Sequence, residues 1–332
     1  TTGAGKDYRK TSTDAYGKGT FAVNEVPASA YTDDVEKSFA SYNDAAIVVI
    51  GRSGSESQDL PTDKLASGYT YLQLDDDERA MLKMASDNFD KVVVLLNTQN
   101  PMELADLEDD SIDAVMWIGS LGQTGAGGVA EALNGTVNPS GHLPDTYAYD
   151  LKSAPSSANF GSYAIVNGTD RFTSSYMAYA EGIYVGYRYY ETAADEGLID
   201  YDSVVQYPFG YGLSYTSFDE KMGSVAYDTE SGTISFDVTV TNTGDVAGKD
   251  VVEVYYNPPY TNGGIEKASA NLVSFEKTRN SNLVNPKPSP SNSTMTIWRH
   301  TITGTPNPMC WNQEITESPY VPTRTASLTK RP

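Results

Sequence analysis

The sequence of 332 residues is poor in the residue types that build disulfide frameworks and metal sites. It holds one cysteine, Cys310, and two histidines, His142 and His300. A single cysteine excludes an internal disulfide, and so few nitrogen and sulfur ligands argue against a zinc site. No stretch reaches the roughly 18 consecutive apolar residues that a membrane-spanning helix requires. We therefore expect no disulfide scaffold, no metal, and no membrane segment or membrane partner.

Basic residues are also scarce. Lys and Arg together number 23 against 44 Asp and Glu, which gives a net charge of −21. Phosphates would be repelled by such a chain, so we expect no nucleic-acid partner, whereas a neutral ligand is compatible with the charge. Strong acidity also maintains the solubility of secreted proteins. The first residues, TTGAGKDYRK, form no charged and apolar leader, so we expect that any export signal was removed or never included.

The residues that are present predict an α/β domain. Short, continuous apolar runs occupy Ala45–Ile50, Lys91–Leu96 and Ile112–Ile118, as is typical of strands buried on both faces. A helix is predicted at Asp76–Asn88, where acidic residues fill the first turn, and another at Val129–Leu133. Strands that alternate with helices at this spacing indicate a parallel sheet.

The pattern changes in the second half of the chain. Residues 146–216 are irregular and rich in tyrosine, and we expect the stretch Tyr184–Tyr190 to pack domains together. From Ile234 to Val240, and again from Val252 to Tyr256, apolar residues alternate with others. Period-two alternation predicts the antiparallel strands of a small β-sandwich.

The last segment differs from everything before it. Residues 279–332 hold 6 of the 23 basic residues, 2 of the 44 acidic residues and 8 of the 17 prolines. A basic, proline-rich disordered tail is one interpretation. We favour a frameshift, because the shifted codons of Arg279–Ser291 can encode the strand-like string ELEPGESETVTV. The β-sandwich would then lack its last strands.

These features predict five segments. They are an N-terminal remnant, an α/β domain, a tyrosine-rich connection, a partial β-sandwich and the tail, at residues 1–25, 26–165, 166–218, 219–278 and 279–332.

Ligands of parallel sheets bind beyond the carboxyl ends of the strands, so the loop after Ile50 draws attention. This loop, GRSGSESQD, places the carboxyl group of Glu56 among small residues. Glycosidases of the common kind need two carboxylates, of which one is protonated. On spacing alone, Glu56 is one of 44 acidic residues, and a solvated loop glutamate is the more frequent case. The loop is neither a G-x-S-x-G nucleophile elbow nor a P-loop.

Several strings together resemble the second and third domains of glycoside hydrolase family 3, of β-glucosidase type. They are AAIVVIGRSGSESQD, VVVLLNTQNPMEL, AVMWIGSLGQTGAGG, EGIYVGYRYYE and YPFGYGLSYTSF, and the resemblance covers about residues 26–278. It implies a mostly parallel sheet sandwiched by helices, followed by an incomplete fibronectin-III-like β-sandwich. It also implies retaining hydrolysis of terminal β-D-glucosides without a cofactor, by a bacterial enzyme that is secreted or held at the cell surface.

The resemblance also implies functional residues. The family's acid/base glutamate falls on Glu56, with Arg52 in the matching place as a substrate-binding residue. Ser55 stands where a glycine usually precedes the glutamate, which loosens the match. Asp59 is the alternative acid and is otherwise expected to bind substrate.

Trp117 and Gln123 resemble the family's loop that faces the sugar. Packing against the family's (β/α)₈ barrel is an equally good explanation for both residues.

The family's nucleophile is an aspartate in a Ser-Asp-Trp-like motif, and no such motif occurs in this sequence. Without a second carboxylate the double displacement cannot proceed, so we expect the isolated chain to be inactive or weakly active. The alternatives are a non-catalytic carbohydrate-binding or scaffold module, and β-xylosidase or β-N-acetylglucosaminidase specificity within the same family. The expected partners are small β-glucosides or oligosaccharides. Self-association is expected through the face that would meet the barrel, because such a face is a large apolar patch.

Overall fold

The computed structural model describes residues 25–52, 60–65, 67–161, 163–165, 175–230 and 233–278, together with the backbone of residues 292–301. The chain divides into two compact units. Unit 1 includes residues up to Ala130 and Tyr147–Leu151, and unit 2 includes Glu131–Thr146 and the chain from Lys152 onward.

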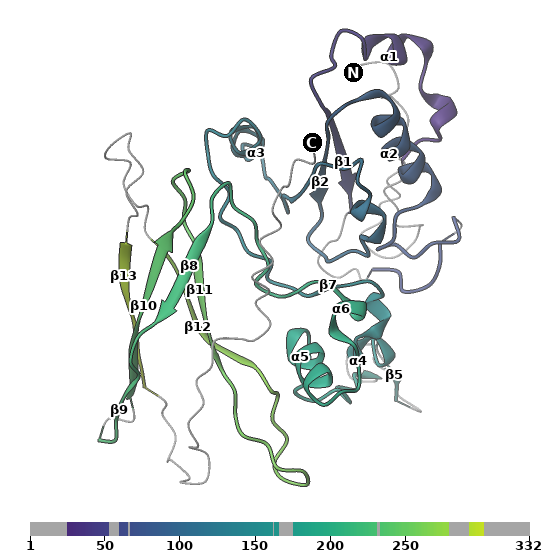
Figure 1. The fold of residues 1–332 in the computed structure, drawn as a ribbon. Coiled ribbons are helices and arrows are strands. Elements are labelled where there is room, and N and C mark those ends of the chain that lie inside the picture. The colour runs from purple at the N-terminus through teal and green to yellow at the C-terminus, as the bar shows by residue number, and fades with distance from the viewer. Residues whose placement is uncertain are drawn as a thin grey trace. The chain divides into compact units, whose positions relative to one another are not determined.

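Unit 1 is built on a parallel sheet of three strands in the order β1 (Ala46–Gly51), β2 (Val92–Asn97) and β3 (Ala114–Trp117). The connection from β1 to β2 contains helix α2 (Asp76–Asn88), which lies beside these two strands (Figure 1). This order confirms the predicted α/β fold with a parallel sheet. The predicted helix 76–88 coincides with α2, and the predicted strands are within two residues of the observed ones at their starts.

Smaller elements complete unit 1. They are η1 (Ala28–Ala30), α1 (Asp33–Ser38), η2 (Ala105–Glu108) and β4 (Tyr147–Ala148), while α3 (Ala126–Leu133) spans the division between the units.

Much of the core of unit 1 lies on one face of the sheet, although Leu95 of the central strand β2 is buried on the other face. Val48 and Ile50 are 6% and 1% exposed, and Leu82 and Ala85 of α2 are also buried. On the opposite face of β1, Ile47 and Val49 are 54% and 50% exposed. The prediction that this strand is buried on both faces is therefore wrong. A continuous apolar run does not distinguish burial of one face from burial of two, since that depends on the elements that pack against the strand.

Unit 2 begins with short elements and ends in antiparallel sheets. The short elements are α4 (Pro155–Ala158), β5 (Tyr163–Ala164), β6 (Ser175–Tyr176), α5 (Tyr187–Asp195), α6 (Tyr201–Val204) and β7 (Val205–Tyr207), and they follow η3 (Leu151–Ser153), which spans the division between the units. One sheet pairs β10 (Thr233–Asn242) with β8 (Phe218–Met222), β9 (Ala226–Asp228) and β13 (Asn292–Thr301). The other pairs β11 (Val251–Tyr256) with β12 (Asn271–Lys277).

The two antiparallel sheets share a core, and Figure 1 shows β8 and β10 alongside β11 and β12. Its buried members are Val238 and Val240 of β10 and Val252 of β11, with Phe218 and Phe236 packed against them. The alternation predicted at 234–240 and 252–256 thus corresponds to real strands. β13 lies in the predicted tail, of which residues 279–291 and 302–332 are outside the described residues.

Helix α2 begins with two reciprocal hydrogen bonds. The Oδ1 atom of Asp75 accepts from the backbone N–H of Glu78 at 2.9 Å, and Glu78 Oε2 accepts from the N–H of Asp75 at 3.0 Å. This capping box satisfies two backbone donors that the helix itself leaves without partners.

We predict that Asp75→Ala lowers the free energy of unfolding by about 1 kcal/mol, because it removes the capping acceptor. Urea unfolding followed by circular dichroism measures the change. Asp75→Asn retains an acceptor oxygen, so its free energy of unfolding should remain close to that of the unsubstituted protein. Asp87→Ala removes only the exposed pair of Asp87 with Lys83 and should cost about 0.5 kcal/mol or less. Equal losses from Asp75→Ala and Asp75→Asn would contradict the capping role.

Candidate functional site

The carboxyl ends of the three parallel strands meet at one edge of the sheet in unit 1. Gly51 at the end of β1 pairs with Asn97 at the end of β2, and Leu96 pairs with Trp117 at the end of β3. The loops that follow therefore start side by side, as expected for a ligand-binding edge of an α/β sheet.

Hydrogen bonds connect these loops to one another. The backbone N–H of Arg52 donates to the carbonyl of Asn97 at 3.1 Å, and the side chain of Asn97 donates to the carbonyl of Gly119 at 2.5 Å. The side chain of Gln99 donates to Ser120 Oγ at 2.7 Å. A loop built this way has a defined position relative to its neighbours, which is what a precise site requires.

Arg52 is the most completely bonded side chain at this edge. The residue is 9% exposed. Its guanidinium forms a two-point ion pair with Glu78, at 2.6 Å from Nη1 to Oε1 and 2.8 Å from Nη2 to Oε2. Its remaining donors bond to three backbone carbonyls, those of Gly51, Tyr71 and Gln73, at 2.8, 2.6 and 2.7 Å.

A guanidinium has five N–H donors, and each donor of Arg52 has a protein acceptor. A sugar hydroxyl would have to displace one of them. The predicted substrate contact of Arg52 stays a prediction, and the observed bonds hold this residue at the end of β1.

Trp117 ends β3 with its indole fixed in orientation. Its Nε1–H donates to the carbonyl of Thr98 at 2.7 Å, and the side chain remains 37% exposed. The chain then turns sharply at Gly119 and Gly122, whose φ angles are 56° and 62°. Such left-handed angles favour glycine. The fixed and half-open indole can offer an aromatic face to a ligand.

Of the other predicted site residues, the structure describes only Gln123. Gln123 is exposed in the turn before α3. Glu56 and Asp59 lie outside the described residues, so their predicted roles as acid and as substrate contact remain predictions. The structure thus brings Arg52 and Trp117 to the same sheet edge.

Glu78 is the residue at this edge that the sequence analysis did not identify. It is 4% exposed and shares its carboxylate between Arg52 and the backbone of Asp75. The spacing of Asp75 and Glu78 is that of a capping box, which is a local signal for the cap but not for the distant partner Arg52.

Unit 2 holds carboxyl groups whose protonation is strongly influenced by burial. Burial raises the pKa of Glu191 to about 7, although a hydrogen bond from the hydroxyl of Tyr201, at 2.7 Å, opposes the shift. Burial also raises the pKa of Glu253, which accepts a hydrogen bond from Tyr255. Perturbed acids often mark functional sites. Both groups here are bonded to tyrosines within the interior, which is the pattern of structural networks.

No assembly of metal ligands and no membrane helix is found in the described ranges. No group of three or more His, Cys, Asp or Glu side chains there is placed to hold a metal ion. Within those ranges, no helix combines the length and apolar character that a membrane crossing needs.

We predict that Arg52→Met lowers the free energy of unfolding by about 3–5 kcal/mol, because it leaves the carboxylate of Glu78 buried without a cation. The matched control is Arg79→Met. Arg79 also forms a two-point pair, with Asp106 at 3.0 and 2.8 Å, but at the exposed surface, where about 1 kcal/mol or less is expected. Urea unfolding measures both changes.

The double variant Arg52→Met/Glu78→Leu separates the ion pair from the carbonyl contacts. It should recover only part of the loss, because the carbonyls of Tyr71 and Gln73 still lack their donors. Full recovery would contradict the contribution of these carbonyls, and equal losses from Arg52→Met and Arg79→Met would contradict the importance of burial.

Known proteins of similar sequence indicate the family of this chain. The model of the glycosyl hydrolase family 3 C-terminal domain matches residues 7–187. A β-glucosidase of Ruminococcus albus is 38% identical over 278 residues, which are 82% of this chain and 26% of that protein. β-Glucosidase A of Butyrivibrio fibrisolvens is 31% identical over 304 residues, which cover 82% of this chain and 34% of the relative.

Solved structures agree. A β-glucosidase from Paenibacillus barengoltzii superposes with a TM-score of 0.67 at 34% identity, over 84% of this chain and 28% of that one. β-Glucosidase 3B from Thermotoga neapolitana, in complex with α-D-glucose, gives 0.63 at 32% identity, over 86% and 36%. The chain thus spans about a quarter to a third of the length of these proteins. Since the family model covers more than half of the chain, the protein belongs to the family of glycosyl hydrolase family 3 C-terminal domains.

Proposed function

We propose that this chain supplies the acid/base part of a retaining β-glucosidase that hydrolyses terminal β-D-glucosides. The observation that carries the proposal is the bonded edge formed by Arg52, Asn97 and Trp117, from which the loop with Glu56 starts. The relatives named β-glucosidase give the reaction class. One solved relative contains glucose, which supports a small sugar as ligand.

In the proposed mechanism, Glu56 protonates the departing glycosidic oxygen and then removes a proton from the attacking water. A retaining enzyme needs a second carboxylate about 5–5.5 Å from the first, to form the covalent glycosyl intermediate. We assign this nucleophile to a part of the longer parent protein outside the present sequence. The buried ion pair of Arg52 holds the end of β1, from which the chain continues toward Glu56.

Unit 2 fits a supporting role in this proposal. Its two antiparallel sheets, which share the core of Val238, Val240 and Val252, correspond to the fibronectin-III-like β-sandwich of the parent enzyme. Sheets of this kind have a core of inward-facing side chains and need no catalytic group.

We predict that the isolated chain does not hydrolyse p-nitrophenyl β-glucoside, because a single carboxylate cannot complete the double displacement. The test uses a chimera in which this chain replaces the matching segment of the Ruminococcus albus β-glucosidase. We expect the chimera to hydrolyse the substrate. Glu56→Gln should then lower kcat/KM for cellobiose by about 10²–10⁴-fold. For a dinitrophenyl glucoside, kcat/KM should fall much less, because this leaving group departs without protonation.

The controls separate the acid from its neighbours. Glu36→Gln changes an exposed carboxyl on α1 and should leave both substrates unaffected. Asp59→Asn is compared in the same way. If it, and not Glu56→Gln, lowers kcat/KM for cellobiose far more than for the dinitrophenyl glucoside, Asp59 is the acid and the assignment to Glu56 is overturned. A chimera that unfolds cooperatively yet hydrolyses neither substrate would contradict the proposed function.

We also propose that the isolated chain self-associates through the uncovered face of β1. Ile47 and Val49 are both half exposed on this strand, and exposed apolar patches favour association. Light scattering should detect dimers or larger species, and Ile47→Lys/Val49→Lys should yield monomers. Val137→Lys alters a similarly exposed valine elsewhere and should leave association unchanged. This proposal is overturned if the unsubstituted 332-residue chain is monomeric at every concentration.

A further inference from the structure

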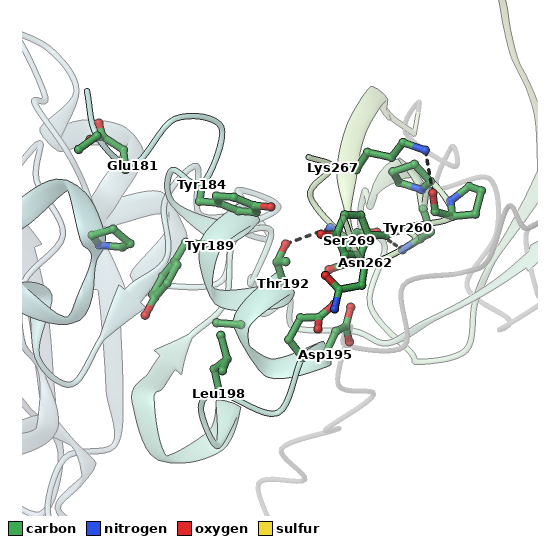
Figure 2. Close-up of a pocket in the computed structure, with 17 residues that line it drawn as sticks. Glu181, Tyr184, Tyr189, Thr192, Asp195, Leu198, Tyr260, Asn262, Lys267 and Ser269 are labelled. Atoms are coloured by element: carbon green, nitrogen blue, oxygen red, sulfur yellow. Dashed lines mark hydrogen bonds between the residues drawn. The ribbon is translucent and has the colours of Figure 1, made fainter. Parts of the chain in front are cut away.

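Unit 2 contains a large pocket that the proposed acid/base chemistry does not use. It has a volume of about 1100 Å³ and is lined by α5, by the segment before it, and by the connection between β11 and β12. Figure 2 shows Glu181 near Tyr184 and Tyr189 at one end, and Tyr260 and Ser269 at the other. Small-molecule pockets usually measure about 300–1,000 Å³. This one has room for a ligand of several sugar units.

The walls of the pocket are held by hydrogen bonds within the protein. The backbone N–H of Ser269 donates to Thr192 Oγ1 at 3.0 Å, which joins the β11–β12 connection to α5. Asn257 donates to the carbonyl of Ser269 at 2.8 Å, and Lys267 donates to the carbonyl of Pro259 at 2.8 Å. The pocket is therefore formed before any ligand binds, which lowers the entropy cost of binding.

Two polar atoms of the lining have no hydrogen-bond partner. They are Oε2 of Glu181 and Oγ of Ser269, and both are buried. A buried polar atom without a partner costs about 1–3 kcal/mol. A ligand hydroxyl can donate to the carboxylate of Glu181 and can either donate to or accept from the hydroxyl of Ser269. Both atoms are out of contact with solvent, so a ligand hydroxyl bonds to them once the side chain rotates toward the cavity.

The charge of the lining selects against anions. Three carboxylates, Glu181, Asp195 and Glu196, stand against one ammonium group, that of Lys267. Tyr184 donates its hydroxyl to the carboxylate of Glu266, which raises the pKa of Tyr184 to about 12. The ring of Tyr184 therefore stays neutral at physiological pH. Tyrosine rings offer apolar faces with a polar edge, which suits the alternating C–H and hydroxyl surfaces of a pyranose.

We infer that this pocket binds a neutral oligosaccharide, with Tyr184 and Tyr260 against its C–H faces and with Glu181 and Ser269 bonded to its hydroxyl groups. The pocket belongs to unit 2, whereas Arg52 belongs to unit 1. Binding here needs no turnover and does not depend on the role of Glu56.

The test is isothermal titration of the purified chain with cellotetraose, xylotetraose and mannotetraose, and with tetragalacturonic acid as the anionic control. We expect at least one neutral tetrasaccharide to bind and the anionic one not to bind. Ser269→Ala should weaken binding about fivefold, as expected for the loss of one hydrogen bond of about 1 kcal/mol. It should not lower the melting temperature, because its hydroxyl bonds to no protein atom. Tyr260→Ala should weaken binding about tenfold through loss of its ring.

Two variants serve as controls. Tyr42→Ala removes an exposed tyrosine of unit 1 and should not change the affinity. Glu56→Gln should bind as the parent does, which separates this pocket from the proposed catalytic loop. The inference is overturned if no neutral tetrasaccharide binds, if Ser269→Ala and Tyr260→Ala bind as the parent does, or if tetragalacturonic acid binds equally well.

Discussion

The buried ion pair of Arg52 and Glu78 is the contact on which the described sheet edge of unit 1 depends. Removing both charges from water is costly, and their attraction offsets that cost only when every remaining donor and acceptor is also bonded. Here the guanidinium bonds to both carboxylate oxygens and to three carbonyls. The pair thereby fixes the end of β1, the chain at Tyr71–Gln73 and the first turn of α2 in one arrangement.

Glu78 connects this arrangement to local helix formation. Its Oε2 atom accepts from Arg52 and from the N–H of Asp75, so one oxygen serves both the ion pair and the cap of α2. Both bonds therefore depend on the position of the same carboxylate oxygen. The helix start and the strand end are consequently not independent features.

The sequence predicted the elements better than their surroundings. The helix 76–88 and the strands of the parallel sheet follow from local periodicity and capping residues. The exposure of Ile47 and Val49, and the contact of Arg52 with Glu78 across 26 positions, depend on which segments pack together, and no local pattern encodes that.

The tyrosine-rich stretch shows the same limit. Tyr187 packs against Phe209 and Tyr255, at 4.8 and 5.9 Å between ring centroids, as a packing residue would. Tyr184 and Tyr189 instead line the pocket. Neighbouring tyrosines in and just before α5 have different surroundings, so composition alone assigns them one role when they have two. The other wall of the pocket comes from residues 257–269, which the sequence places far away.

The proposed division of a glycosidase between this chain and another part of its parent sets a strict geometric condition. An acid and a nucleophile about 5–5.5 Å apart must be held by two separate folding units, and a misplacement of about 1 Å can cost 10²-fold in rate. A loop bonded only to solvent could not meet that condition. Arg52 has all five of its donors bonded to protein acceptors, so the end of β1 cannot shift without exposing a buried charge or leaving it unpaired. The ion pair of Arg52 with Glu78 therefore fixes the point at which the chain leaves the sheet toward the proposed acid.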